Sequence, residues 1–132
     1  MKNLFITAVV SSLVFISCRK EDCPIPETPS IVGFWQGKYG GTTSYPNSGY
    51  SALFRSNGTV RFFDGADTAT ANEAEGTYSV IGSTVTASYN YLFSGFQYSV
   101  SATVDSKFTF LEGTFGTGVN TSGDGKWFMI KK

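Results

Sequence analysis

The alternation of apolar and polar side chains through residues 84–104 constrains the fold more than any other feature of the sequence. In TVTASYNYL, residues 84–92, valine, alanine and tyrosine occupy every second position, and FQYSVSATV, residues 96–104, repeats the pattern. A period of two is typical of a β-strand that buries one face and exposes the other. The intervening Phe93-Ser94-Gly95 is short enough for a hairpin turn. We therefore predict antiparallel β-structure for this part of the chain.

Turn signals divide the rest of residues 31–132 into further short strands. Ser56-Asn57-Gly58 predicts a hairpin, because asparagine and glycine readily adopt positive φ angles. ADTATANEAE, residues 66–75, lacks a clear alternation, and we expect a long loop there with one helical turn at most. The predicted strands span residues 31–39, 50–55, 59–64, 76–80, 84–92, 96–104, 108–115 and 126–131.

These eight short strands, joined mostly by tight turns, predict an all-β fold: an eight-stranded antiparallel up-and-down barrel. The 12 phenylalanines and 7 tyrosines favour strands, and closing the sheet into a barrel removes both of its exposed edges. A two-sheet sandwich is the alternative, but long crossover connections are lacking. Glycines within the strands would supply the bends that closure requires; they are Gly33, Gly37, Gly76 and Gly113.

The N-terminal residues carry an export signal. Lys2 precedes a mostly apolar run, residues 4–14, which suits a signal peptide and is shorter than the ~20 residues of a membrane span. The following Phe15-Ile16-Ser17-Cys18 resembles the lipobox of bacterial lipoproteins, although leucine is usual where Phe15 stands. The resemblance implies that Cys18 becomes the acylated first residue of the mature protein. The alternative is a free thiol beside an ordinary signal peptide.

The residues after Cys18 refine this prediction. Arg19-Lys20-Glu21-Asp22 is similar to the short acidic export signal of surface lipoproteins of the Bacteroidota, which implies an outer-membrane lipoprotein of the cell envelope, facing either the periplasm or the outside. CPIPETP, residues 23–29, reads as a semi-rigid proline-rich spacer. We expect a signal peptide over residues 1–17, an acylated tether over 18–30 and a barrel domain over 31–132.

A second resemblance concerns the barrel. Gly33-Phe34-Trp35 is similar to the Gly-x-Trp signature of lipocalins and their calycin relatives, and GTYSVIGSTVTASY and LEGTF resemble strand starts of bacterial lipocalin-like lipoproteins. Over residues 31–132 the resemblance implies an eight-stranded barrel closed at one end by Trp35. The Thr-Asp-Tyr motif of that family is missing. The arginine that stacks on its signature tryptophan has no clear counterpart, since the last predicted strand region offers only Lys126, Lys131 and Lys132.

Two binding functions follow from the predicted barrel. Eight strands enclose room for core side chains or for one small ligand. The first hypothesis is therefore a pocket for a small apolar or aromatic molecule, lined by Trp35, Tyr78, Tyr89, Tyr91, Tyr98 and Trp127, with Phe108 and Phe110 also facing inward. The alternative is that these rings fill the core and that the loops act as a protein-interaction or inhibitor module. Tyr45, in residues 40–49, and Asn120, in residues 116–125, are the candidates for such loop contacts.

Catalysis is the weakest hypothesis, and we predict that the protein is not an enzyme. The chain has no histidine, and Cys23 is its only cysteine besides Cys18. Glu112 interrupts a predicted inward face, where burial would demand a partner such as Arg55 or Arg61. The other candidate carboxylates are Asp64, Asp67, Glu73, Glu75 and Asp124, and nothing in the sequence pairs them. We expect no metal, no cofactor and, with a net charge of zero, no nucleic-acid partner.

One candidate modification lies in the predicted long loop. Asp67-Thr68-Ala69 is similar to the O-glycosylation sequon of the Bacteroidota, which implies Thr68 as the glycosylated residue. The partners expected for the whole chain are thus a membrane, through the acyl anchor, and a small ligand or an envelope protein.

Overall fold

The structure, a computed structural model, describes residues 28–132. The predicted signal peptide, Cys18, Cys23 and most of the predicted tether lie outside the described residues. Within residues 28–132, no helix is long and apolar enough to cross a membrane.

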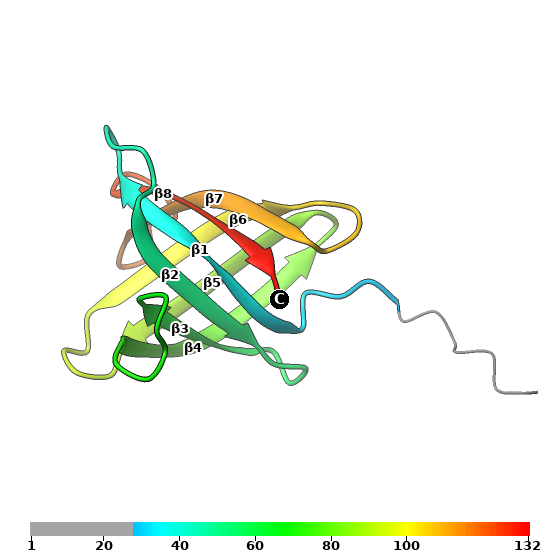
Figure 1. The fold of residues 1–132 in the computed structure, drawn as a ribbon, viewed down its shortest axis with the longest axis horizontal. Coiled ribbons are helices and arrows are strands. Elements are labelled where there is room, and N and C mark those ends of the chain that lie inside the picture. The colour runs from blue at the N-terminus through cyan, green and yellow to red at the C-terminus, as the bar shows by residue number, and fades with distance from the viewer. Residues whose placement is uncertain (1–27) are drawn as a thin grey trace, which may run out of the picture.

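The described residues form a closed antiparallel β-barrel of eight strands, as predicted (Figure 1). Each strand pairs with the next along the chain, and β8 returns to pair with β1, so the topology is up-and-down and the sandwich alternative is wrong. The strands are β1 (Gly33–Gly41), β2 (Ser48–Phe54), β3 (Thr59–Asp64), β4 (Asn72–Ile81), β5 (Thr84–Tyr91), β6 (Gln97–Val104), β7 (Phe110–Thr117) and β8 (Gly125–Lys131).

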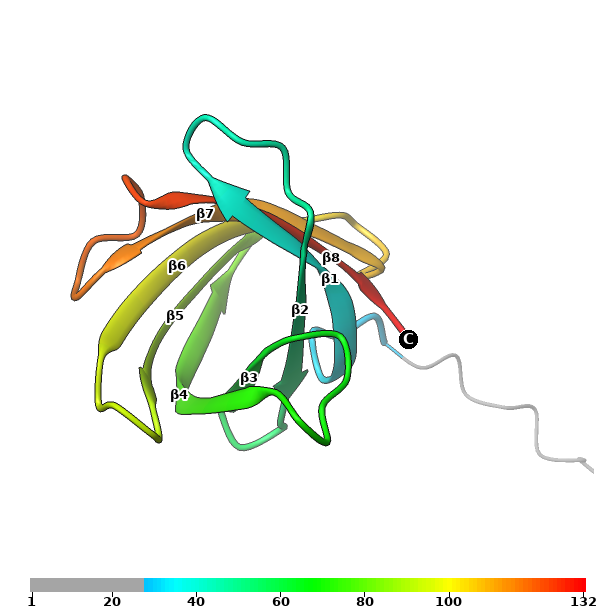
Figure 2. The same cartoon turned by 60° about the vertical axis from the view of Figure 1, so that its left-hand side comes forward.

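The two ends of the barrel differ (Figures 1 and 2). One end, which we call the open end, carries the connections of residues 42–47, 65–71, 92–96 and 118–124, three of which are longer than any at the other end. The other end, which we call the closed end, carries the connections of residues 55–58, 82–83 and 105–109, together with the segment before β1 and the end of β8. One of these turns carries the predicted hairpin signal: Gly58 has a φ of 82°, and Asn57 Oδ1 accepts hydrogen bonds from the Thr59 amide at 3.1 Å and hydroxyl at 2.7 Å.

Strand β4 begins earlier than predicted. The expected loop over residues 66–75 is wrong for its last four residues, which belong to β4. Ala74 points into the barrel and is fully buried, whereas Glu73 and Glu75 point outward. Pairing with β3, which sets Asn72 opposite Asp64 and Ala74 opposite Phe62, marks the start of this strand.

The predicted alternation of strand β7 is wrong by one residue. Phe108 lies in the turn before the strand with a φ of 54°, and its ring packs against the core. The strand itself begins at Phe110, which points outward, is 37% exposed and stacks on Phe128 of β8 at 6.3 Å between ring centroids. A shift of one residue exchanges the two faces of a strand, so Leu111 rather than Phe110 belongs to the core.

Three glycines inside strands permit close approach of neighbouring backbones. A Cβ atom on Gly37 would lie 1.8 Å from the Phe128 carbonyl oxygen, and one on Gly76 would lie 2.0 Å from that of Ser88. At Gly113 the corresponding distance, to the Ser101 carbonyl oxygen, is 2.1 Å. No side chain fits at such distances, so glycine is required where the sheet bends sharply to close.

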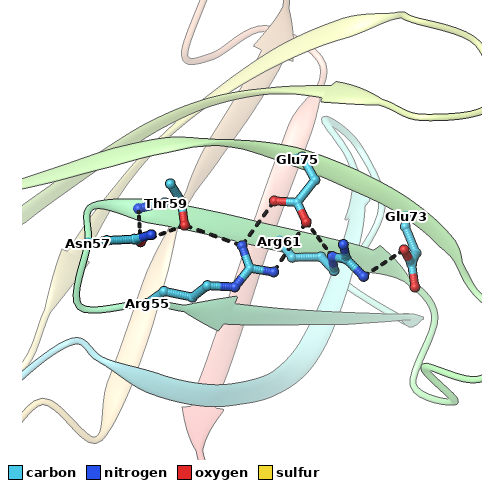
Figure 3. Close-up of polar contacts among 6 residues, drawn as sticks. All are labelled: Arg55, Asn57, Thr59, Arg61, Glu73 and Glu75. Atoms are coloured by element: carbon cyan, nitrogen blue, oxygen red, sulfur yellow. Dashed lines mark hydrogen bonds and ion pairs between the residues drawn. The ribbon is translucent and has the colours of Figure 1, made fainter.

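An ion-pair network covers the outer face of β3 and β4 (Figure 3). Arg55 donates to both carboxylate oxygens of Glu75, at 3.0 and 3.2 Å, and Arg61 bridges Glu75 and Glu73. The hydrogen bond from Arg55 is the main reason why the pKa of Glu75 lies below its usual value. The expected pairing of either arginine with Glu112 is wrong, because Glu112 is exposed on the outer face of β7.

Candidate functional site: a tyrosine-lined pocket at the open end

Trp35 seals the closed end of the barrel. Its ring is fully buried, and its indole Nε1 donates to the Ile31 carbonyl at 2.8 Å. The Lys131 Nζ lies 5.9 Å from the centre of that ring and donates to the Ser30 carbonyl at 2.6 Å. Lys131 thus links the end of β8 to Trp35 and to the segment before β1. Nearby, the Tyr78 hydroxyl donates to the Arg55 carbonyl at 2.8 Å.

Aromatic rings fill the middle of the barrel. Phe62, fully buried, lies between Tyr50 and Tyr89, with ring centroids 5.4 and 4.3 Å away. The hydroxyls of the two tyrosines are hydrogen-bonded at 2.7 Å, and Trp127 packs edge-on against Tyr50 at 6.2 Å. These contacts lie between the open end and Trp35, which does not line the pocket at the open end.

Above this layer, a pocket of about 210 Å³ lies at the open end, where the connection of residues 92–96 contributes to its lining. Its walls are aromatic except for one carboxylate, that of Asp64 at the end of β3. The residues that line it are Tyr39, Tyr50, Asp64, Tyr89, Tyr91, Phe93, Phe96, Tyr98 and Phe115.

The structure brings together three of the six predicted ligand-binding residues. Tyr89, Tyr91 and Tyr98 line the pocket, and their rings contact one another at centroid distances of 5.7 to 6.2 Å. Trp35 and Tyr78 lie at the closed end, and Trp127 is buried below the pocket against Tyr50. Those three residues belong to the packed core rather than to the pocket.

The sequence analysis did not predict three polar residues of the pocket, although the period of two along their strands places them on the inward face. Tyr39 lies four residues after Trp35 on β1 and therefore faces the same way. Tyr50 begins the inward set of β2, which continues with Ala52 and Phe54. Asp64 is the last member of the inward set of β3, which begins with Val60 and Phe62. An aspartate at an inward position of a strand is the sequence feature that could have identified this end of the barrel.

Burial raises the pKa values of four of the pocket tyrosines. It is the largest cause of the raised pKa values of Tyr50, Tyr89 and Tyr91, and the neighbouring tyrosine and Asp64 charges add to it for Tyr91. Burial also raises the pKa of Tyr39, followed by its interaction with the Asp64 carboxylate. At neutral pH these side chains are therefore uncharged hydroxyls, able both to donate and to accept hydrogen bonds.

The rim of the pocket carries exposed apolar side chains. Phe93 and Phe96, on the connection between β5 and β6, line the pocket and are each 68% exposed. The adjacent Leu92 is 59% exposed. Contiguous exposed apolar side chains of this kind are typical of binding surfaces.

The predicted loop residues lie outside the pocket. Tyr45, 83% exposed, is in the connection between β1 and β2, and Asn120 is exposed in that between β7 and β8. Thr68 lies in the β3–β4 connection, half-buried, next to Asp67, whose carboxylate accepts the Ala69 amide at 3.0 Å. Among residues 28–132, no three histidine, cysteine, aspartate or glutamate side chains cluster as a metal site would need.

Comparison with known proteins adds no relative to this picture: no protein-family model matches the chain, and neither a curated protein nor a solved structure matches it.

Proposed function

We propose that the barrel binds a small aromatic or apolar molecule in the open-end pocket. The observation that carries the proposal is the ring of tyrosine side chains around a pocket of about 210 Å³, directly above a core that is otherwise filled. In ligand sites, aromatic ring faces usually provide apolar contact, and a few hydroxyl groups orient the ligand by hydrogen bonding.

The size of the pocket limits the ligand. Its volume of about 210 Å³ equals the share of roughly seven water molecules at ~30 Å³ each, which suits a molecule on the order of ten non-hydrogen atoms. Drug-sized ligands occupy ~300–1,000 Å³ and would have to extend past Phe93 and Phe96 into solvent. We therefore expect a single-ring compound rather than a long acyl chain.

The N-terminal sequence supports a lipoprotein anchor, and the barrel supports a lipocalin-like carrier. We propose that Cys18 is acylated and holds the barrel at the outer membrane of the cell envelope. Because residues 28–32 enter at the closed end, such an anchor would turn the pocket away from the lipid. The stacking of Lys131 on Trp35 favours membership of the lipocalin-like group.

Native mass spectrometry of the protein purified gently from the cells that make it tests ligand binding. We expect a reproducible extra mass that organic extraction removes. The extra mass should disappear in Tyr98→Ala, which opens the pocket wall, and persist in Tyr45→Ala, which removes the same side chain from an exposed loop. Circular dichroism confirms that both variants fold. A bare mass for the native protein, or an adduct retained by Tyr98→Ala, would contradict the proposal.

A second candidate function is protein interaction. It is favoured by a groove of about 510 Å³ on the outer face of β7 and β8, where Tyr45 and Pro46 overhang the stacked pair Phe110 and Phe128. If a polypeptide partner occupies this groove, Tyr45→Ala should weaken the complex and Tyr98→Ala should not, which is the reverse of the ligand experiment.

A further inference from the structure

Asp64 is the charged residue of the open-end pocket. It follows Phe62 on the inward face of β3 and is half-buried at the rim. Within residues 28–132, the salt bridges join Arg55 and Arg61 to Glu73 and Glu75, so Asp64 takes part in none of them. A carboxylate placed among aromatic rings without a protein cation would gain from a positively charged partner.

The other walls of the pocket also favour a cation. The faces of tyrosine and phenylalanine rings carry partial negative charge and attract ammonium groups within ~6 Å. Tyr39, Tyr91 and Tyr98 line the same pocket as Asp64, and no lysine or arginine lines it. A tyrosine hydroxyl oxygen can also accept a hydrogen bond from an N–H donor.

We infer that the open-end pocket takes a small aromatic amine or ammonium compound, with its cationic group beside Asp64 and its ring packed on the tyrosines. This inference rests on the proposed function and names the chemical class of its ligand. The rim residues Phe93 and Phe96 would cover the exposed edge of the bound ring.

A pair of size-matched probes tests the charge requirement. Phenethylamine is a cation at pH 7, and 2-phenylethanol is a neutral molecule of nearly the same shape. Binding of each to the purified full chain is measured by isothermal titration calorimetry. Because charged hydrogen bonds and cation–π contacts both favour the amine, we expect 2-phenylethanol to bind about tenfold more weakly or worse.

Three substitutions identify the source of the preference. Asp64→Asn should reduce the preference to the smaller share that the ring faces contribute, and Asp64→Glu should retain it because the charge is kept. Glu112→Gln removes the same kind of charge from the outer face of β7 and should leave the preference unchanged. Thermal unfolding of each variant checks that the barrel is intact.

The outcomes separate this inference from the proposed function. Equal affinity for the two probes, tighter binding of 2-phenylethanol, or a preference that Asp64→Asn leaves unchanged would overturn the inference. If neither probe binds and the native protein also carries no extra mass, both the inference and the proposed function are overturned.

Discussion

The hydroxyl oxygens of Tyr50 and Tyr89 lie 2.7 Å apart inside the barrel, although β2 and β5 are not neighbours in the sheet. Each hydroxyl is the other's partner in a layer that Phe62 and Trp127 shield from solvent. This bond forms the floor of the open-end pocket, so it links the stability of the barrel to the shape of its site.

Removing either of these hydroxyls should destabilise the barrel. Tyr50→Phe or Tyr89→Phe leaves a buried hydroxyl without its partner, and we expect each to lower the free energy of unfolding by ~1–2 kcal/mol. The double variant should cost less than the sum of the two, as a double-mutant cycle in urea would measure. Tyr45→Phe, on an exposed loop, is the control, and strictly additive losses would show that the two hydroxyls are not coupled.

Alkaline pH should destabilise the protein. Tyr50 and Tyr89 keep their protons in the folded state well above the ordinary pKa of ~10, whereas unfolded tyrosines lose them there. The unfolded state then binds fewer protons, so stability is complete below pH ~10 and falls above it, by up to ~1.4 kcal/mol per pH unit for each such group. Urea unfolding between pH 8 and 11 measures the slope. Tyr89→Phe should make it shallower, and an unchanged midpoint up to pH 11 would refute the prediction.

Acid should weaken the turn between β6 and β7. The Asp105 carboxylate accepts hydrogen bonds from the Thr109 amide at 2.6 Å, the Thr109 hydroxyl at 2.7 Å and the Phe110 amide at 2.8 Å. The bond from Phe110, followed by those from Thr109, lowers the pKa of Asp105 to about 2. The stabilisation is therefore present above pH ~4, the unfolded value, and is lost as the pH falls toward 2.

Thermal unfolding of Asp105→Asn at several pH values tests this assignment. The variant should melt below the native protein at pH 7, and the two melting temperatures should converge as the pH falls from 4 to 2. Glu112→Gln, which changes an exposed carboxylate on β7, should show no such convergence. If the difference in melting temperature between Asp105→Asn and the native protein stays constant with pH, the charge of Asp105 does not stabilise the turn.

Lys131 should stabilise the closed end. Its Nζ lies over Trp35 at 5.9 Å and donates to the Ser30 carbonyl, so Lys131→Met should cost ~1 kcal/mol and alter the tryptophan fluorescence. Lys131→Arg keeps the charge and should restore most of the loss. Lys126→Met, on the exposed face of the same strand, should stay within ~0.5 kcal/mol of the native protein. An equal effect of the two methionine substitutions would argue against a specific contact.

Cys18→Ser should release the protein from membranes. An acyl chain adds ~0.8 kcal/mol per buried methylene to membrane binding, and two or more chains make the attachment stable. Fractionation of cells should move the variant from the envelope to the soluble fraction, whereas Cys23→Ser should remain bound. Envelope association that survives Cys18→Ser would exclude this anchor.

Local sequence was sufficient for most of the strands. The alternation from Val85 to Val104 fixes which side chains face inward, because side chains along a strand point to opposite faces in turn. Asn57-Gly58 fixes a hairpin for an equally local reason, since Gly58 needs a positive φ. Both features were predicted correctly because each depends on residues only a few positions apart.

Local sequence failed where contacts with other strands decide the structure. The start of β4 is set by its pairing with β3, where Asn72 lies opposite Asp64 and Glu75 lies opposite Arg61. The alternation in β7 depends on the conformation of Phe108, whose φ of 54° shifts the strand by one position. A bulky residue rarely adopts such an angle, so the surrounding packing has to impose it.

The sequence by itself determined an eight-stranded barrel with aromatic side chains inside, because the period of two and the short turns depend on residues that are close in sequence. Only the tertiary structure decided which of those aromatics form a site. Tyr39, Tyr91 and Tyr98 come together with Asp64 because closure and register place them at the same height along the barrel, while Trp35 and Tyr78 lie at the opposite end. Height along a barrel is a relation between distant strands, and no local pattern encodes it.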